Sequence, residues 1–229
     1  MNTLISLTDR FGTLSVMACM IALAMMTEIS FADSTDDAGF VKLFDGKTTA
    51  GWQGATDGYD IVDGELRCRK GAGGNLLTSK EYSDFDLRFE FKLTPGANNG
   101  LAIRAPKNGD PAFDGIEIQI LDDGHEKYAG LQPWQVHGSI YGVVAAQRNC
   151  LNKTGEWNTE EVIAKGSKIT VLVNGKKIVD ADIADFRNGK KMTLDAKPHL
   201  GLSRTVGHVG FAGHGDEVHF RNIRIKSLE

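Results

Sequence analysis

The sequence predicts an all-β domain, a sandwich or barrel built from about a dozen short strands. Three observations lead to this prediction. Apolar and polar residues alternate in several short runs, which is the period of a strand with one buried face. No long run repeats its apolar residues every 3.6 positions, as a helix would. The chain also has 27 glycines and only 5 prolines in 229 residues, which suits tight turns better than a Pro-rich linker.

Composition limits the class of protein and its partners. Hydrophobic residues make up 41% of the chain and charged residues 24%, values that are ordinary for one soluble globular domain. The formal net charge is −4. This mild acidity argues against a nucleic-acid partner, because binding to phosphates needs a basic surface.

The first predicted strands cover 40–44, 59–62, 65–69 and 84–93. Asp45-Gly46 ends the first of them. Asp63-Gly64 joins the second and third as a hairpin turn. The run 84–93, DFDLRFEFKL, alternates most strictly, since its leucines and phenylalanines are separated by charged residues. That strand should have one buried and one solvated face.

The second half of the chain continues the pattern, with predicted strands at 100–104, 115–121, 168–183, 209–211 and 217–225. The run 168–183 is a hairpin, because Asn174-Gly175 supplies the two positive-φ residues of a type I′ turn. Residues 159–165 fit either one helical turn or a strand. The stretch 122–158 is irregular, and loops of that length in a compact domain usually carry function.

Residues 1–32 are predicted to be a signal peptide that is removed from a single mature domain, 33–229. Leu14–Met26 is an apolar run that is too short to span a bilayer comfortably. Ser30 and Ala32 place small residues at the −3 and −1 positions of a cleavage site. We therefore expect an exported protein, periplasmic or secreted, with no transmembrane segment after signal removal.

Cys68 and Cys150 are the only cysteines of the expected mature domain. In an oxidising compartment two such thiols can form a disulfide. Each can also be a small buried side chain, and their spacing is not that of a zinc site. The sequence leaves their pairing open.

The strand expected at 115–121 carries the most informative polar residues. Its isoleucines point one way, while Glu117 and Gln119 point the other way. An acid and an amide on the front of a core-packed strand are typical of a sugar site. The alternative is that both face solvent on an outer sheet. Arg104 is expected on the same strand face as Ala102. It can contact a ligand, or it can form a salt bridge at the rim of the sheet.

The long irregular stretch and the start of the next strand carry a cluster of aromatic and polar residues: Trp134, His137, Tyr141, Glu156, Trp157 and Asn158. Aromatic rings stack on sugar rings, and amide, carboxylate and imidazole groups bind hydroxyls. The six histidines show no metal-binding spacing, so a metal is neither implied nor excluded. There is also no nucleophile elbow, phosphate-binding glycine loop or dinucleotide fingerprint.

Eight motifs in order resemble the 3-keto-disaccharide hydrolase family: FVKLFDGKTTAGW (40–52), IVDGEL (61–66), NNGLAIRA (98–105), GIEIQILDD (115–123), GSIYG (138–142), GEWN (155–158), VNGKKI (173–178) and HFRNIRIK (219–226). The resemblance covers about residues 40–228. It implies a concanavalin A-like jelly-roll sandwich, similar to bacterial glucanases. It also implies a carbohydrate substrate, and it adds Asn99, Asp122 and His214 to the substrate-binding candidates.

The resemblance implies a particular reaction. A ketone at C3 of a sugar acidifies the hydrogen on C2, so a base can remove it and the C1 substituent leaves by β-elimination. Glu117 is the candidate base, and Arg104 or a bound divalent cation is the candidate stabiliser of the enolate. His137, Tyr141 or Glu156 is the candidate acid for the leaving oxygen. An ordinary retaining glycosidase would need a second carboxylate, whereas this strand has Gln119 where a glucanase has an acid.

Two departures from the family pattern stand out. His214 is kept in the segment FAGHG, but an amide-bearing neighbour is lost. The stretch 194–206 is longer and more basic than the family pattern leads us to expect. The alternative function is a non-catalytic carbohydrate-binding module on the same fold, because this fold supports lectins as readily as enzymes. Oligomeric state is open in both cases.

Overall fold

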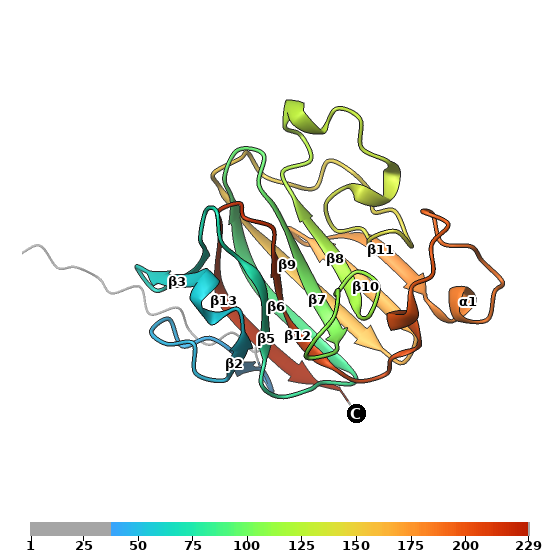
Figure 1. Cartoon of the computed structure of the whole chain (residues 1–229), viewed down its shortest axis with the longest axis horizontal. Helices are drawn as coiled ribbons and strands as arrows, with labels where there is room; N and C mark the ends of the chain where they lie inside the picture. Colours follow the sequence, from blue (N-terminus) through green and yellow to red (C-terminus); the bar gives the residue numbers. More distant parts are fainter. Residues whose placement is uncertain (1–37, 229) are drawn as a thin grey trace, which may run out of the picture. The chain divides into compact units, whose positions relative to one another are not determined.

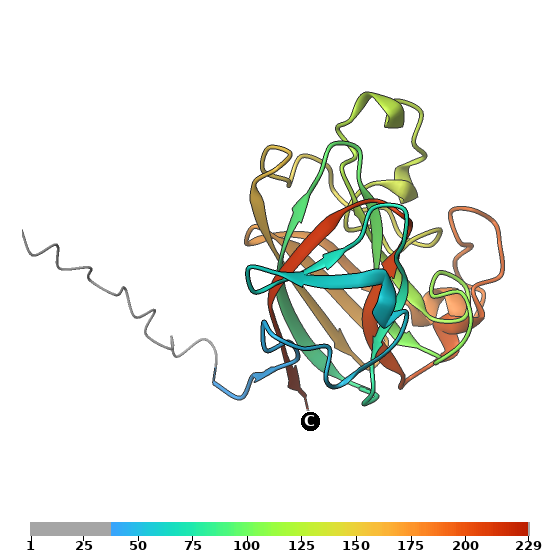
Figure 2. The same ribbon diagram turned by 60° about the vertical axis from the view of Figure 1, so that its left-hand side comes forward.

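The computed structural model describes residues 38–228, which form two antiparallel β-sheets packed face to face (Figure 1, Figure 2). This architecture confirms the predicted jelly-roll sandwich. The larger sheet has the order β11-β10-β9-β6-β13-β4-β3, with β1 also paired to β13. Its strands are β1 (Val41–Lys42), β3 (Tyr59–Val62), β4 (Glu65–Cys68), β6 (Phe85–Leu93), β9 (Trp157–Lys165), β10 (Lys168–Val173), β11 (Lys176–Asp182) and β13 (Val218–Ser227).

The smaller sheet has five strands in the order β2-β5-β12-β7-β8. They are β2 (Trp52–Gly54), β5 (Gly74–Thr78), β7 (Asn98–Ala105), β8 (Ile116–Leu121) and β12 (His208–Gly213). Among the described residues the only α-helix is the four-residue α1 (Ala184–Arg187), and 3₁₀ turns lie at 56–58, 126–128, 133–135 and 200–203. None of these helices is long and apolar enough to cross a membrane.

The core lies between the two sheets and is rich in aromatic rings. In β6, every second residue from Phe85 to Leu93 is buried, as the alternation in DFDLRFEFKL predicts. Phe211 of the smaller sheet stacks on Phe220 of the larger one, with ring centroids 3.8 Å apart. The inner face of each sheet therefore packs in the core. A binding site can form only on an outer face, and the outer face of the smaller sheet carries the polar residues of β8.

The sequence-based expectations differ from the structure at short or ambiguous elements. Residues 159–165 belong to β9, which settles the choice between a strand and a helical turn. Strands β2 and β5 were not predicted, because three and five residues beside several glycines show too little alternation. Cys68 and Cys150 are both free thiols. The predicted signal peptide lies outside the described residues.

Candidate active site

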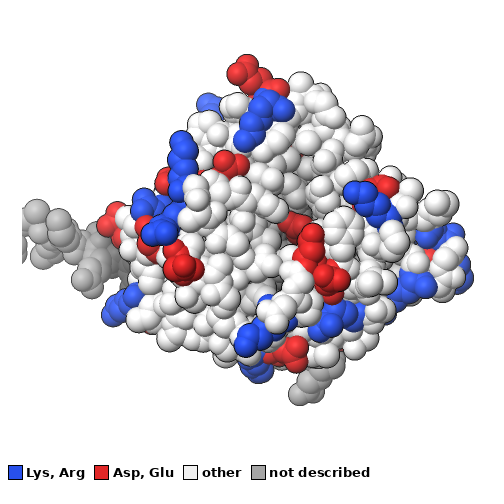
Figure 3. All heavy atoms as spheres, in the orientation of Figure 1, with Lys and Arg blue, Asp and Glu red and all other residues white. Residues whose placement is uncertain are grey.

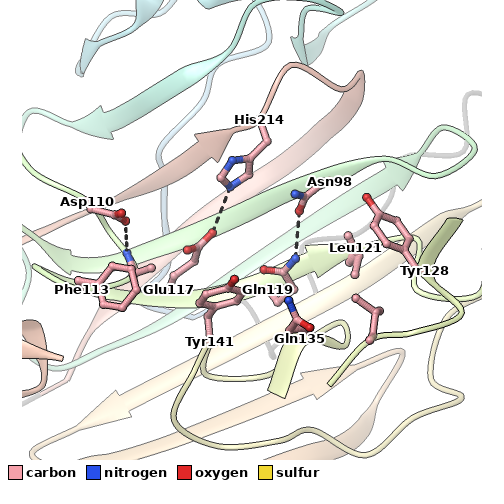
Figure 4. Close-up of a pocket in the computed structure, with 12 residues that line it drawn as sticks. Asn98, Asp110, Phe113, Glu117, Gln119, Leu121, Tyr128, Gln135, Tyr141 and His214 are labelled. Carbon is pink, nitrogen blue, oxygen red and sulfur yellow. Dashed lines mark hydrogen bonds and ion pairs between the residues drawn. The ribbon is translucent and has the colours of Figure 1, made fainter. Parts of the chain in front are cut away.

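Strand β8 presents its polar residues on the outer face of the five-stranded sheet. Ile116, Ile118 and Ile120 belong to the core, and the alternation turns Glu117 and Gln119 away from it. Both polar side chains are nevertheless only 5% exposed. Loops cover this outer face, and the space that they enclose with β8 forms a cavity (Figure 4).

The cavity has a volume of about 220 Å³, below the roughly 300–1,000 Å³ of common ligand pockets, so it suits a group as small as one sugar ring. Its lining residues are Asn98, Asp110, Ala112, Phe113, Glu117, Gln119, Leu121, Tyr128, Leu131, Gln135, Tyr141 and His214. Figure 3 shows this face of the molecule, with acidic side chains in and beside a hollow near its centre. Four of the sequence-predicted residues, Glu117, Gln119, Tyr141 and His214, are thus brought together.

Small residues on the neighbouring strands leave room for the Glu117 side chain to lie across the surface of the sheet. Ala102 lies opposite Glu117, Gly100 lies opposite Gln119, and Ala212 lies opposite Gly100 on the next strand. All of them share the cavity face. The Glu117 carboxylate lies over Gly100, so closely that a Cβ on that glycine would overlap Oε1. Gly100 is therefore required by the position of the carboxylate.

Gly100→Ala should lower kcat/KM on the substrate by about 10²-fold, the loss that a displacement of about 1 Å of a reacting group causes. The residue does not have a positive φ, so the substitution strains no backbone and acts through Glu117. Gly130→Ala is the matched control, since nothing lies within 4 Å of its Cβ position. Steady-state kinetics of both variants checks this. Equal activity in the two would mean that the position of Glu117 does not matter.

His214 completes an acid–base pair with Glu117. It follows β12, and its Nε2 lies 3.5 Å from Glu117 Oε1, an ion-pair distance (Figure 4). The neighbouring Glu117 raises the pKa of His214 above its ordinary value, although burial opposes this shift. The histidine side chain is 47% exposed. A half-exposed imidazole thus faces the buried Glu117 carboxyl group across the cavity.

Tyr141 is held beside this pair by the backbone of β8. Its N–H donates to the carbonyl of Glu117 at 2.9 Å, because the segment 138–141 runs along the free edge of the strand. Trp134 packs edge-to-face on the Tyr141 ring, with centroids 5.0 Å apart, and therefore stands behind the cavity wall. Burial raises the pKa of Tyr141, so its hydroxyl stays protonated at neutral pH.

Residues that the sequence analysis did not identify supply the rest of the lining. Gln119 donates from Nε2 to Asn98 Oδ1 at 3.0 Å, which sets two amides side by side. Asn98 was detectable, because it shares its strand face with Gly100 and Ala102. Five more come from loops and short 3₁₀ turns, where no strand alternation shows which side chains turn inward: Asp110, Phe113, Tyr128, Leu131 and Gln135. The cavity therefore has a charged part at Glu117 and an apolar, aromatic part at Leu121 and Tyr128.

Arg104 does not reach the cavity, which corrects its expected ligand contact and its role as stabiliser of the enolate. Of the two alternatives, the structure has a salt bridge, to Asp84, but a buried one. The φ of Arg104 is +48°, and the pairing of β7 with β12 shifts register at this point, so the alternation of the strand is broken. The guanidinium is fully buried and donates to Ser83 O, Gly166 O and Asp84 Oδ1 at 2.7–3.1 Å. Arg104 ties β7 to the larger sheet.

His137 also lies away from the cavity, which corrects its expected role as an acid. Its ring stacks on Phe91 in the core, with centroids 5.0 Å apart, and burial lowers its pKa to about 3. Nδ1 accepts from the N–H of Leu121 at 3.2 Å. The ring proton therefore sits on Nε2, which faces the carboxyl of Glu160 at 3.6 Å. Glu160 is fully buried, and burial raises its pKa well above the ordinary value.

Glu160→Gln should stabilise the protein at neutral and alkaline pH. A carboxyl whose pKa is raised by folding contributes stability that is complete below its unfolded value, near 4.5, and is lost as pH rises through the folded value. Glutamine keeps the neutral state at every pH, and its oxygen can accept from His137. We expect the Tm at pH 8 to rise by about 2–4 °C, the effect of about 1 kcal/mol in a domain of this size. Thermal scans at pH 5 and pH 8 check this. Parallel Tm–pH curves of the two proteins would contradict it.

Three further candidates are buried structural residues outside the cavity lining. Asp122 accepts from Gly96 N–H at 2.7 Å and from Thr154 Oγ1 at 3.1 Å, and thereby closes the end of β8. Asn99 faces the core, where its Oδ1 accepts from Gly100 N–H. Asn158 accepts from Asn174 Nδ2 and Asn152 N–H at 2.8 Å each. These contacts explain polar side chains that sequence alone assigned to a sugar.

Glu156 and Trp157 belong to another surface. Glu156 is exposed at the turn before β9, and neither residue lines the cavity. The Trp157 ring packs between Lys92 Nζ at 4.5 Å and the Arg221 guanidinium at 3.9 Å, both on the larger sheet. Their placement corrects the expected roles of Glu156 as an acid and of Trp157 as a sugar contact. Within residues 38–228, no three His, Cys, Asp or Glu side chains are grouped as metal ligands.

Comparison with known proteins shows which family this chain resembles. A family model described as a 3-keto-alpha-glucoside-1,2-lyase-like domain matches residues 39–226. A Bacteroides thetaiotaomicron protein named 3-keto-disaccharide hydrolase is 26% identical over 232 aligned residues, which cover 85% of this chain and 80% of that protein.

Two solved structures show the same fold. One is a Parabacteroides distasonis protein named "putative glycosyl hydrolase". It is 32% identical, with a TM-score of 0.73, over 82% of this chain and 99% of that one. The other is the carbohydrate binding module CBM66 from Bacillus subtilis, 15% identical with a TM-score of 0.51, over 77% of this chain and 96% of that one. At that identity, the second likeness shows the fold alone.

Proposed function

This chain belongs to the 3-keto-alpha-glucoside-1,2-lyase-like family, and from that membership we propose that it cleaves 3-keto glycosides by β-elimination. Addition of water to the unsaturated product gives net hydrolysis. A carbohydrate-active role is supported by the names of the relatives. The observation that supports the chemistry is the convergence of Glu117, His214 and Tyr141 on one small cavity.

Each of the three groups suits one part of the elimination. The Glu117 carboxylate takes the proton from C2, and the electron pair of that C–H bond forms the enolate of the C3 ketone. The imidazolium of His214 stabilises the enolate oxygen by charge and hydrogen bonding. The enolate then expels the C1 oxygen, to which the protonated Tyr141 hydroxyl gives its proton. The Asn98 and Gln119 amides, which pair with each other through one hydrogen bond, keep further polar atoms for the sugar hydroxyls.

A second candidate is an ordinary glycosidase, because Asp110 adds a second carboxylate to the cavity lining. Glycosidases use two carboxyl groups, one of them as a general acid. Asp110 Oδ1, however, already accepts from Ala112 N–H at 2.9 Å and so shapes its own loop. This contact favours Asp110 as a structural and binding residue over a catalytic one.

The test compares a 3-keto disaccharide with its unoxidised parent. The oxidised sugar should be cleaved and the parent should be inert, since only the ketone makes the C2 hydrogen acidic. Sugar release is followed by chromatography. Equal cleavage of both would support the glycosidase, and binding without cleavage of either would support the carbohydrate-binding module. Export of the enzyme is part of the proposal and is supported by the signal-peptide pattern of residues 1–32.

A further inference from the structure

The segment 190–206 lies beside the cavity but supplies none of its lining residues. At its centre Asp195 and His199 form a buried pair, with Nε2 3.1 Å from Oδ2 and side chains only 2% and 1% exposed. Neither residue is needed by the elimination described above. Burying two polar side chains is costly unless they are hydrogen-bonded, so a buried Asp–His pair calls for an explanation.

His199 joins this segment to the loop that carries Phe113. Its Nδ1 lies 2.8 Å from the carbonyl oxygen of Ala112, and its ring packs on the Phe113 ring with centroids 4.9 Å apart. The backbone adds a third contact, because Gly201 N–H donates to Phe113 O at 2.7 Å. Ala112 and Phe113 both line the cavity.

The same pair reaches the loop that carries Tyr141. Asp195 N–H donates to the carbonyl of Gly142 at 3.0 Å. A Cβ on Gly142 would stand 2.6 Å from both Asp195 Oδ2 and His199 Nε2, so the loop closes directly onto the pair. One ion pair therefore contacts two separate walls of the cavity.

Both ring nitrogens of His199 face acceptors, a carbonyl on one side and a carboxylate on the other. The ring therefore bridges the Ala112 carbonyl and the Asp195 carboxylate. Burial opposes ionisation of Asp195, but hydrogen bonds from Lys197 N–H and His199 lower its pKa. The nearby charged and titratable groups are Lys197, whose Nζ lies 5.6 Å from the Phe113 ring, and Tyr141.

We propose that the Asp195–His199 pair is a positioning device that holds the Phe113 wall of the cavity at the distance that a sugar ring requires. This role rests on the proposed function. If the aromatic wall is already fixed before the sugar binds, binding does not have to pay the entropy cost of ordering that wall. The His199 side chain touches the binding wall through the Ala112 carbonyl, whereas the hydrogen bond to the Tyr141 loop comes from the backbone N–H of Asp195, which side-chain substitutions keep. Glu117 and His214 are held by other strands. The pair should therefore act on substrate affinity rather than on the chemical step.

The test is His199→Gln, with Asp195→Asn as a milder variant of equal volume. The control is Asp185→Asn, because Asp185 pairs with Lys191 of the same segment at 2.8 Å and does not line the cavity. In the two test variants KM for a 3-keto disaccharide should rise about tenfold, as expected for loss of a charged hydrogen bond that holds the wall. The kcat should stay within about threefold, and the control should match the wild type.

Hydrogen exchange supplies a readout that needs no substrate. In His199→Gln the amides of residues 112–114 and of Gly201 should exchange faster, while those of the core strand β6 should not change. Unchanged exchange in these loops would overturn the proposal, and so would a fall in kcat at constant KM. If the wild type cleaves no 3-keto sugar, the proposed function fails. The positioning role is then judged by the exchange rates together with binding of the 3-keto disaccharide, and equal affinity of variant and wild type would overturn it.

Discussion

Glu117→Gln is expected to lower kcat on a 3-keto glycoside by about 10²–10⁴-fold, the usual contribution of a general base. The amide keeps the volume of the side chain over Gly100 but cannot accept the C2 proton. In the proposed mechanism other groups bind the substrate hydroxyls, so we expect KM to change little. Steady-state kinetics on the oxidised disaccharide measures both parameters.

The matched control is Gln119→Glu, which places a carboxylate on the same face of the same strand, one position further along the alternation. It should not restore turnover to Glu117→Gln, because Gln119 lies opposite Gly100 and is engaged with Asn98. Deuterium from solvent should enter at C2 in the wild type if the enolate is reprotonated. Full activity of Glu117→Gln would pass the role of base to His214 or Asp110.

The face of β8 that carries the site could be predicted from sequence, since strict alternation leaves a six-residue strand only two faces. The fold class could be predicted for the same reason, together with the hairpin signal at Asn174-Gly175. In a regular strand, the order of polar and apolar residues therefore predicts which face each side chain takes. Glu117 and Gln119 were assigned to the site in this way.

The walls of the cavity could not be predicted, because they depend on tertiary contacts. Tyr141 stands beside Glu117 because its N–H bonds to the edge of β8, and no local pattern shows which edge a loop will join. His137 shows the converse. It directly precedes Gly138, whose N–H bonds to the same edge, yet its ring turns into the core and stacks on Phe91. In loops, the polar character of a residue is therefore a poor predictor of whether its side chain lines the cavity.

Arg104 shows how one irregular residue breaks a periodic pattern. The strand LAIRA alternates correctly up to Ile103, which is buried in the core. A positive φ at Arg104 and a register shift against β12 then turn its side chain toward the larger sheet. A positive φ is rare for arginine, so sequence offered no reason to expect it. Three acceptors compensate for the strain.

Arg104→Ala should therefore destabilise the fold strongly without changing the chemistry. The variant loses hydrogen bonds to Ser83 O, Gly166 O and Asp84, and it leaves a cavity where a fully buried side chain stood. Asp84 is 28% exposed, so water can solvate it in part. We expect a loss of about 3 kcal/mol in the free energy of unfolding, at the lower end for a broken buried ion pair. Urea unfolding measures this.

Arg67→Ala is the control that shows how much of the expected loss of stability is due to burial of the ion pair. Arg67 also forms a two-pronged pair, donating to both oxygens of Asp60 at 2.7–2.8 Å, but the two side chains are 30% and 34% exposed. Such a surface pair contributes at most about 1 kcal/mol. At temperatures where Arg104→Ala is still folded, its kcat should equal that of the wild type, because the guanidinium lies outside the cavity. A large fall in kcat at unchanged stability would instead return Arg104 to the catalytic group, and it would contradict the orientation that the register shift in β7 gives to this side chain.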